Sequence, residues 1–126
     1  MSDLLASLQF DADGLIPAIA QQFDTGEVLM LAWMTRDAVE ETLATGRVCY
    51  WSRARRALWR KGERSGQWQR LVELRIDCDR DALLLKVDQQ GVACHTGRRV
   101  CFFHRIEDGK VKVVEPVLVD PATLYG

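Results

Sequence analysis

Three aspartates alternate with other residues in the segment Asp77-Cys78-Asp79-Arg80-Asp81. If the chain is extended here, successive side chains point to opposite faces, so the carboxylates share one face and Cys78 lies on the other. Mg²⁺ accepts carboxylate oxygens as ligands, and zinc accepts a cysteine thiolate. The segment could therefore supply Asp77, Asp79 and Asp81 to magnesium and Cys78 to zinc. The alternative is an acidic strand end in solvent beside a buried cysteine.

Two further cysteines, Cys94 and Cys101, are separated by six residues that include Gly97. A glycine turn of this length can bring both sulfurs to one zinc ion, at the usual Zn–S distance of about 2.3 Å. With Cys78 there are three candidate thiols, and a catalytic zinc typically has three protein ligands and a fourth position for water. The alternative is that both cysteines are small buried apolar side chains.

The histidine that follows Cys94, His95, is one of only two in the chain. Histidine is the side chain that most readily exchanges a proton near neutral pH, so His95 could act as a general base or donor beside a metal site. A histidine that is only hydrogen-bonded within its loop is the alternative. The other histidine, His104, and the remaining cysteine, Cys49, lie in strand-like stretches, and we interpret both as structural.

The net charge of −1 hides a strongly cationic stretch from Arg53 to Arg70. Arginine forms paired hydrogen bonds with phosphate oxygens, and Gly62 and Gly66 permit close approach of the backbone to an anion. We interpret the stretch as an anion cradle, although it lacks the Walker pattern. A basic loop in solvent is the alternative. The candidate substrate-binding residues, which include a second cationic point after Cys94, are Arg53, Arg55, Trp59, Lys61, Ser65, Arg98 and Arg99.

The hydrophobic pattern predicts the elements that position these residues. Residues 18–23 and 28–33 form a predicted β-hairpin. Thr35 is a typical helix N-cap and Gly46 a typical residue after a helix, so a helix is expected between them. Residues 47–52 predict a strand. Residues 53–66 show no clear period and predict a long functional loop.

Residues 72–76 alternate between apolar and charged side chains, which predicts a half-buried strand, and 82–87 predict a second one. Residues 100–106 and 110–115 predict a hairpin across Glu107-Asp108-Gly109. The expected fold is therefore a single α+β domain over residues 1–126, a mostly antiparallel sheet with one or two helices.

The size and composition limit the class of protein. A chain of 126 residues fits one domain, and 48% hydrophobic with 28% charged residues argues against disorder. No apolar run approaches the ~20 residues that span a bilayer, and the N-terminal residues do not have the pattern of a signal peptide. A net charge near zero gives no field toward nucleic acid. We therefore expect a cytoplasmic protein that binds neither membranes nor nucleic acid.

Together these motifs resemble the phosphoribosyl-AMP cyclohydrolase family of histidine biosynthesis. The resemblance rests on the string from Asp77 to Leu84, followed by Cys94-His95-Thr96-Gly97-Arg98-Arg99 and Cys101-Phe102-Phe103. Upstream, Leu29-Met30-Leu31-Ala32-Trp33-Met34, Tyr50-Trp51-Ser52-Arg53 and Leu58-Trp59-Arg60-Lys61-Gly62-Glu63 also match, so the resemblance covers roughly residues 14–105.

The resemblance implies zinc-dependent hydrolysis of the N1–C6 bond in the purine ring of phosphoribosyl-AMP, which gives the ring-opened formimino aminoimidazole carboxamide ribotide. It implies an intertwined homodimer with one zinc per subunit at the interface, bound by Cys78 of one chain and by Cys94 and Cys101 of the other. It also assigns Mg²⁺ to Asp77, Asp79 and Asp81.

Three thiolates would leave the zinc site with a formal charge of −1, so it should acidify water less strongly than a three-histidine site. His95 is then the nearest candidate base. The two phosphates of the substrate call for cations at two places, one at Arg53, Arg55 and Lys61 and the other at Arg98 and Arg99.

Two other classes stay open. A small nucleic-acid-binding module could use the loop arginines with Trp51, Trp59 and Trp68. A zinc-stapled structural protein would lose its fold on chelation and show no turnover. The zinc deaminases, which also attack C6 of adenine, are disfavoured because their H-x-E and P-C-x-x-C signature is absent.

Overall fold

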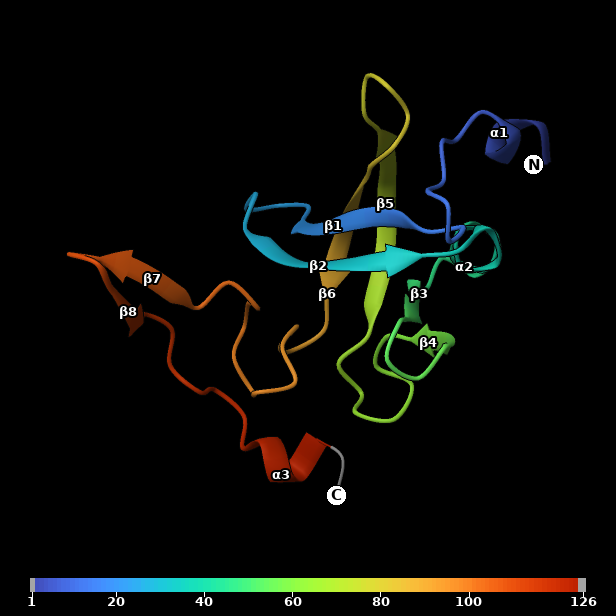
Figure 1. The fold of residues 1–126 in the computed structure, drawn as a ribbon. Helices are drawn as coiled ribbons and strands as arrows, with labels where there is room; N and C mark the ends of the chain where they lie inside the picture. The colour runs from blue at the N-terminus through green and yellow to red at the C-terminus, as the bar shows by residue number, and fades with distance from the viewer. Residues whose placement is uncertain (1, 125–126) are drawn as a thin grey trace.

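A computed structural model describes residues 2–124 of the chain. Within that part, one six-stranded sheet has the strand order β4-β3-β2-β1-β6-β5 (Figure 1). Neighbouring strands are antiparallel except β1 and β6, which are parallel. The strands are β1 (Ile16–Gln22), β2 (Val28–Met34), β3 (Cys49–Ser52), β4 (Ala57–Arg60), β5 (Gln69–Ile76) and β6 (Leu83–Gln89).

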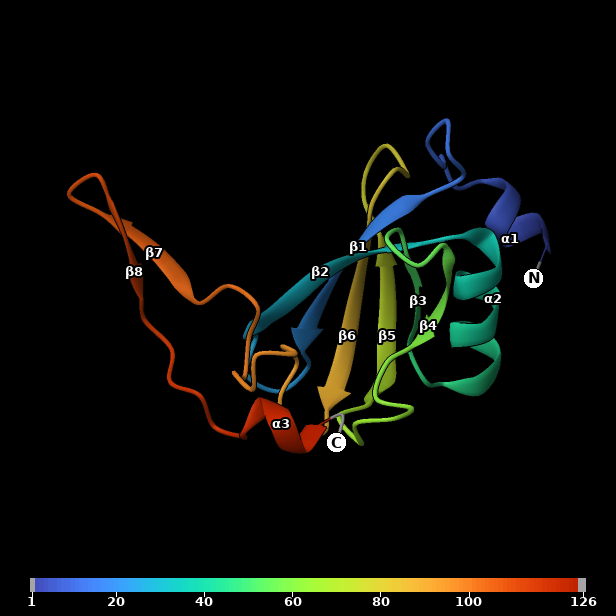
Figure 2. The same cartoon turned by 60° about the horizontal axis from the view of Figure 1, so that its bottom comes forward.

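A separate two-stranded hairpin, β7 (His104–Glu107) with β8 (Lys110–Val113), stands away from the sheet (Figures 1 and 2). The helices of the described residues are α1 (Ser2–Ala6), α2 (Arg36–Thr45) and α3 (Pro121–Leu124). The predicted α+β class with a mostly antiparallel sheet is confirmed. Of these helices only α2 was predicted, because α1 and α3 are too short to show a helical period.

The β1–β2 hairpin and α2 follow the local signals in the sequence. Gly26, with a φ of 79°, lies in the turn between the two strands. The side-chain oxygen of Thr35 accepts a hydrogen bond from the backbone N–H of Ala38, which caps the start of α2. At the other end, the left-handed Gly46 donates its backbone N–H to the carbonyl of Thr42. Both predictions are therefore confirmed.

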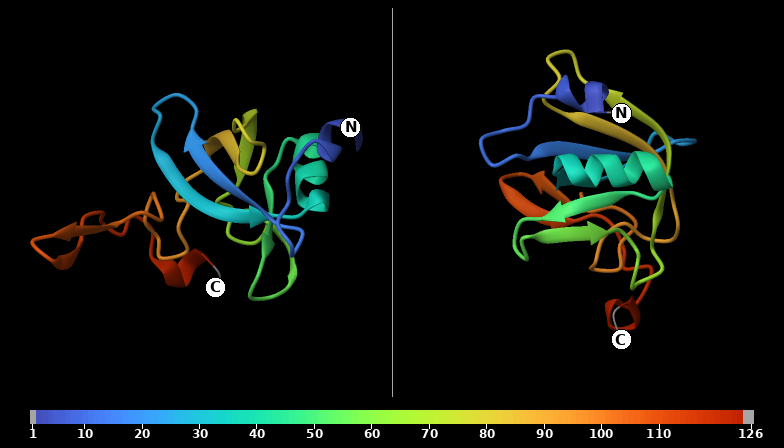
Figure 3. Two further views of the ribbon diagram at one scale, coloured as in Figure 1. Left: turned by 45° about the horizontal axis from the view of Figure 1, so that its top comes forward. Right: turned by 90° about the vertical axis from the view of Figure 1, so that its right-hand side faces the viewer.

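The hydrophobic core lies between one face of the sheet and α2. Alternate residues of β1 and β6 are buried, as expected for strands with one covered face. Ile16 and Leu85 from the sheet and Val39 from α2 belong to the same buried cluster. Figures 2 and 3 show α2 on one side of the sheet and the β7–β8 hairpin on the other.

A chain of buried polar side chains links the sheet to the segment after β6. The hydroxyl of Tyr50 donates to the side-chain oxygen of Gln69, at 2.7 Å. The Gln69 amide donates to Gln89, at 2.8 Å, and the Gln89 amide donates to the backbone carbonyls of Gln90 and Val92. Buried amides that are paired in this way hold their neighbours in one arrangement. These hydrogen bonds therefore fix the position of the first residues after β6 relative to the sheet.

The prediction of a long loop over residues 53–66 is wrong in part. Residues Ala57–Arg60 form β4, which pairs with β3, and Tyr50 lies opposite Trp59. The turn between the strands contains Arg56 in a left-handed conformation with a φ of 53°. An arginine gives no turn signal in the sequence, because glycine, asparagine and aspartate usually take such a position. The hairpin was therefore missed.

The predicted strand over residues 100–106 is also wrong in part, because the strand begins only at His104. Before it, the backbone N–H of Cys101 donates to the carbonyl of Leu29, at 2.7 Å, which holds this segment against β2 instead of in the hairpin. The partner strand ends at Val113, short of the predicted residue 115. The expected strand at 47–52 is likewise shorter and begins at Cys49.

Candidate active site and metal-binding residues

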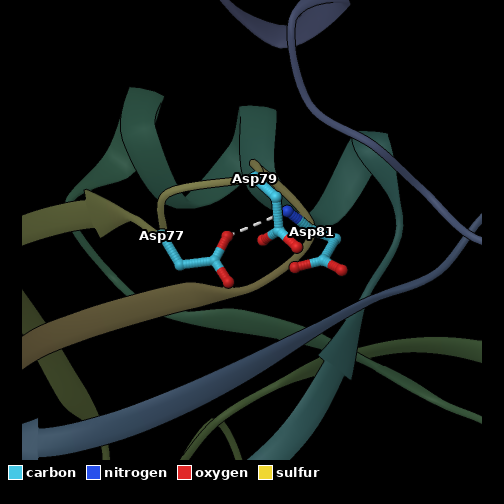
Figure 4. A group of neighbouring side chains, drawn as sticks. All are labelled: Asp77, Asp79 and Asp81. Atoms are coloured by element: carbon cyan, nitrogen blue, oxygen red, sulfur yellow. Dashed lines mark hydrogen bonds between the residues drawn. The ribbon is translucent and has the colours of Figure 1, made fainter.

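The three aspartates of the acidic segment converge, but not as an extended strand. Residues 77–82 form a turn between β5 and β6, in which Arg80 has a φ of 66°. One carboxylate oxygen of Asp77 accepts the backbone N–H groups of Asp81 (3.0 Å) and Ala82 (3.2 Å), which closes the turn. The expected alternation of faces is therefore wrong here. The turn still directs the three carboxylates toward one another (Figure 4).

Ligand atoms of Asp77, Asp79 and Asp81 all lie within 4.8 Å of one another, and all three residues are exposed. Contacts with the carboxyl groups of Asp79 and then Asp77 raise the pKa of Asp81 to about 6. For Asp77, desolvation acts to raise the pKa, but the backbone N–H of Asp81 and the other contacts of the turn outweigh it, and the pKa is lowered. Asp81 therefore keeps its proton up to about pH 6, because crowded carboxylates repel one another when no cation is present.

The predicted thiol pair is brought together at the opposite end of β6. The backbone N–H of Cys94 donates to the carbonyl of Arg98, and Gly97 turns the chain between them with a φ of 84°. Cys94 is close enough to Cys101 to raise the pKa of its thiol, and the Cys94 sulfur lies 3.0 Å from the Thr96 hydroxyl. Spacing and the glycine turn thus identified two side chains that meet.

The two thiols are partly shielded from solvent. Cys94 is buried and Cys101 is half-buried. Burial and, secondarily, the neighbouring Cys94 raise the pKa of Cys101 to about 12. Two thiolates this close repel each other, and a divalent cation would remove that repulsion. Thiolate is also the ligand type of structural and catalytic zinc, so the pair fits zinc.

Cys78 does not join this pair within one chain. It is exposed and lies in the aspartate turn that precedes β6, whereas Cys94 follows the other end of that strand. From the first to the last of the seven residues of β6, a rise of about 3.3 Å between neighbours puts the two ends about 20 Å apart. Among residues 2–124, the group of three or more potential metal ligands that converges in a single chain is the aspartate cluster.

A cavity of about 470 Å³ opens beside the thiol pair, between the β3–β4 hairpin and the loop that follows it. It contains four of the seven predicted substrate-binding residues, together with the predicted base His95. Sequence alone placed His95 and the basic loop in separate segments, and the fold brings them to one hollow. The residues that line it are Ser52, Arg55, Leu58, Trp59, Arg60, Lys61, Gly62, Glu63, Arg64, Ser65 and His95.

The other three predicted substrate-binding residues are outside this lining. The guanidinium of Arg53 stacks over the Trp33 ring at 4.9 Å. That of Arg98 stacks over Phe103 at 4.2 Å, and its Nε donates to a backbone carbonyl. That of Arg99 hydrogen-bonds to side chains of the β1–β2 hairpin. Their assignment to phosphate stays a prediction.

Lys61 differs from the other cations because it is almost fully buried, with 6% of its surface exposed. Burial lowers its pKa, and the nearby thiols Cys101 and Cys94 act in the opposite direction. Its ammonium lies 5.7 Å from the ring centroid of Trp59. Lys61 therefore both lines the cavity and lies near the thiol pair, a combination that the sequence did not reveal.

Gly62 allows the cavity loop to close. It has a φ of 82°, and a Cβ at this position would overlap the backbone of Trp68 and Gln67. The role that the sequence suggested for this glycine, close approach of the backbone, is thus observed toward another backbone segment. No larger residue fits without moving the loop that carries Ser65.

Comparison with known proteins adds to this geometry. The sequence model of the family described as phosphoribosyl-AMP cyclohydrolase matches residues 30–103. A phosphoribosyl-AMP cyclohydrolase of Rhodospirillum centenum is 68% identical over 98% of this chain and 92% of its own length. The chain belongs to the phosphoribosyl-AMP cyclohydrolase family.

Two further relatives, also phosphoribosyl-AMP cyclohydrolases, align with nearly all of this chain and with most of their own length. The phosphoribosyl-AMP cyclohydrolase of Granulibacter bethesdensis is 65% identical over 100% of this chain and 99% of its own. That of Alkalilimnicola ehrlichii is 66% identical over 97% and 86%. The predicted membership of the phosphoribosyl-AMP cyclohydrolase family is confirmed, and with it the prediction of a hydrolase. The nucleic-acid-binding and purely structural alternatives are accordingly disfavoured.

The sequence predicts that no segment of the chain spans a membrane, and the structure bears on this prediction through its helices. Of the helices in residues 2–124, none has the length and apolar character needed to cross a bilayer.

Proposed function

We propose that this protein hydrolyses the N1–C6 bond of the purine ring in phosphoribosyl-AMP, with zinc and Mg²⁺ as cofactors, in the cytoplasm. Family membership supports the reaction class. The observation that carries the assignment to this site is the cavity that joins His95 to Trp59, Lys61 and Ser65 next to a pair of thiols. The cavity therefore combines an aromatic side chain, positively charged groups and a histidine that can transfer a proton.

The lining residues suit the substrate. Trp59 offers an aromatic surface for the purine ring, and Arg55 and Ser65 offer hydrogen-bond donors for one phosphate. The cavity is partly open to solvent, so the rest of the nucleotide can extend out of it. The second phosphate would meet cations beyond the lining, at Arg53 or Arg98.

The metal ligands proposed for zinc are Cys94 and Cys101 of one chain and Cys78 of a second copy. Zinc, when bound, would supply a Lewis acid that makes a water molecule more acidic and the purine carbon more open to attack. Asp77, Asp79 and Asp81 are proposed to bind Mg²⁺, since their oxygens converge and the mutual repulsion of the carboxylates raises the pKa of Asp81.

His95 is proposed to handle the protons of the reaction. Hydrolysis forms a bond between the oxygen of water and C6 and breaks the bond between C6 and N1. His95 would take a proton from the water and return a proton to N1 as that bond breaks. The exocyclic nitrogen stays on C6, which becomes a carboxamide. This role is supported because His95 lines the cavity and is adjacent in sequence to Cys94.

A second copy of the chain is proposed because two apolar surfaces have no cover in the described chain. The first is the face of the sheet opposite α2. On it the register places Ile19 beside Leu31 and Leu84, and Pro17 beside Trp33. Leu31 has 46% of its surface exposed, and the others are half-buried. An apolar sheet face normally packs on another layer.

The second surface is the β7–β8 hairpin, which we call the arm. Its strand pairs place Ile106 opposite Val111 and His104 opposite Val113, so one face is mostly apolar. Ile106 is 81% exposed and Val111 68% exposed. An isolated two-stranded hairpin is at best marginally stable in water. The arm therefore needs a partner, and a second copy would provide one with the apolar sheet face.

Subunit mixing tests this proposal. Cys78→Ser and Cys101→Ser chains should each be inactive, whereas an exchanged mixture should recover activity, because each heterodimer contains one intact site and one site with both defects. The substrate is phosphoribosyl-AMP, followed by the ultraviolet change on loss of the purine, with zinc content measured in parallel. No recovery between chains that demonstrably exchange would contradict the shared site.

A further inference from the structure

We propose that Arg99 is a positioning residue that holds the segment of residues 91–101, the thiol loop, on the β1–β2 hairpin and thereby sets the separation of Cys94 and Cys101 before any metal binds. This inference rests on the proposed function in one respect, which is that the thiol pair is a zinc site. It replaces the expectation that Arg99 binds a substrate phosphate.

Every nitrogen of the Arg99 guanidinium has a protein acceptor. Nε donates to a Glu27 carboxylate oxygen at 3.0 Å, and Nη2 donates to the side-chain oxygen of Gln22 at 3.1 Å. Nη1 donates to the carbonyl of Gly91 at 2.6 Å. Only 26% of the side chain is exposed. The planar fork therefore joins the start of the thiol loop to two residues of the hairpin.

The acceptor on Gln22 is itself fixed. Gln22 is buried, and its side-chain oxygen also accepts the backbone N–H of Gln89 at 2.9 Å. Its amide nitrogen donates to Asp88 at 3.1 Å and to Asp24 at 3.0 Å. Arg99 thus binds a rigid point where β1 and β6 lie side by side.

Backbone hydrogen bonds connect the segment that Arg99 holds to the two cysteines. The residue before Arg99, Arg98, accepts the N–H of Cys94, so the two limbs of the turn are paired. On the far limb, the N–H of Cys101 donates to the carbonyl of Leu29 in β2. One cysteine is therefore held by β2 directly, and the other through the turn that Arg99 holds. Without the Arg99 contacts the Cys94 limb has less to fix it relative to Cys101.

A phosphate at Arg99 would have to replace contacts that already exist. All three nitrogens are used within the chain, and Glu27 already supplies an anion. By contrast, Arg55 lines the cavity. The geometry thus favours a positioning role for Arg99 and leaves substrate anions to the cavity residues.

The test compares Arg99→Met with Arg99→Lys. Zinc affinity is measured in the absence of substrate by competition with a chromogenic chelator. Loss of a group that orients metal ligands typically lowers affinity by about 10–100-fold, and we expect at least a tenfold loss in Arg99→Met. Arg99→Lys should recover only part of it, because one ammonium cannot reach three acceptors in a fixed fork. Arg36→Met, on the exposed surface of α2, is the matched control and should keep the wild-type affinity.

A second measurement needs no metal. In a Cys78→Ser background, diamide oxidises Cys94 and Cys101 to a disulfide, and the two electrons and two protons pass to the diamide N=N bond. Peptide mass mapping follows the rate of this cross-link, which we expect to fall several-fold in Arg99→Met. If the wild-type chain binds no zinc, the proposed function fails, whereas the cross-linking rate still tests Arg99.

Three outcomes would overturn the inference. Unchanged zinc affinity and cross-linking with a lower urea midpoint would mean that Arg99 only stabilises the fold. A raised KM with unchanged zinc affinity would make Arg99 a substrate contact. Full recovery by Arg99→Lys would show that only its positive charge matters.

Discussion

Asp81 shows how strongly the charge of one side chain depends on its neighbours. Its carboxyl is exposed to water, yet Asp79 and Asp77 raise its pKa to about 6. A raised pKa means that the folded chain binds a proton more tightly than the unfolded chain does. As the pH falls through about 6, the repulsion within the cluster is therefore relieved, and above that pH it opposes folding unless a cation is bound.

Mg²⁺ should compete with this proton. Below about pH 6 the affinity for Mg²⁺ is expected to fall by up to about tenfold per pH unit, because one proton must leave, and above that pH it should level off. Calorimetric titration of the whole protein at pH 5 and pH 7.5 measures this. Asp81→Asn should bind weakly with little pH dependence, while Asp108→Asn in the turn of the arm should behave like the wild type. Equal affinity at both pH values would contradict the prediction.

His95 is the residue on which proton transfer depends in the proposed reaction. His95→Ala is expected to lower kcat by about 10²–10⁴-fold, the usual contribution of a general acid or base, with little change in zinc content. Steady-state assays at neutral pH, with metal analysis of the same samples, measure both. His104→Ala replaces the other histidine, which lies in the arm and outside the cavity, and its dimers, isolated by size-exclusion chromatography, should keep the wild-type kcat. Full activity in His95→Ala would assign the base elsewhere.

Residues differ in how far the sequence predicts their contacts. Cys94 and Cys101 could be paired from their spacing because the turn that joins them is local. The aspartates were grouped correctly although the expected extended geometry was wrong, since a tight turn also converges short side chains. The contacts of Lys61 with the thiols and of Arg99 with Gln22 were not predicted, because the partners come from distant parts of the chain that no local pattern reveals.

At the scale of elements, the turn between the two thiols depends on close approach of another segment. Gly97 has a positive φ, and a Cβ there would overlap the carbonyl oxygen of Val119 and lie 3.1 Å from a Val117 methyl. The Gly97 carbonyl also accepts the N–H groups of Leu118 and Val119. The C-terminal segment thus packs directly on the turn that carries Cys94.

Gly97→Ala and Gly109→Ala form a matched pair. Both glycines have a positive φ, but a Cβ at Gly109 meets nothing within 4 Å. The conformational cost, roughly 1–2 kcal/mol, should be common to both. Gly97→Ala should lose further stability, and zinc affinity as well, because the 117–119 segment must move. Urea unfolding and chelator competition measure the two effects. An equal loss of unfolding free energy in both variants would mean that the close approach of residues 117–119 to Gly97 does not contribute to stability.

Helices and strands were predictable where capping or turn residues close in the sequence mark their ends. Thr35 and Gly46 delimit α2, and the Asp108-Gly109 turn of the arm has both residues at positive φ, as a tight hairpin requires. β4 was missed because Arg56 supplies the turn conformation. The segment before His104 was misassigned because its hydrogen bond goes to Leu29, a partner far away in the sequence.

At the scale of the whole molecule, residues 2–124 of one chain leave an apolar sheet face and an apolar arm uncovered. Alternation along β1 and β6 predicts a buried and a half-buried face, and here the second face is also apolar. Sequence patterns cannot say which surface covers it, because the pattern is the same whether the cover belongs to the same chain or to another. The proposed second copy would cover both surfaces and bring Cys78 to the thiol pair.

Ile106→Asp tests the role of the arm in this assembly. A charge on its apolar face should weaken the dimer, so that light scattering during size-exclusion chromatography shows monomers at low concentration, and activity should fall with them. Arg105→Gln changes the opposite face of the same strand and should keep the wild-type mass. Monomers that retain full activity would contradict the proposed assembly.

The length of β6 has a consequence for how this protein can vary. The strand separates Cys78 from Cys94, and these two residues would serve different metal centres in the dimer. An insertion or deletion of one residue within β6 would shift one end of the strand relative to the other and reverse which side chains face the core. Gains and losses of residues should therefore be tolerated in the tip of the arm and excluded from β6, and insertion scanning with a growth selection for histidine synthesis would reveal that difference.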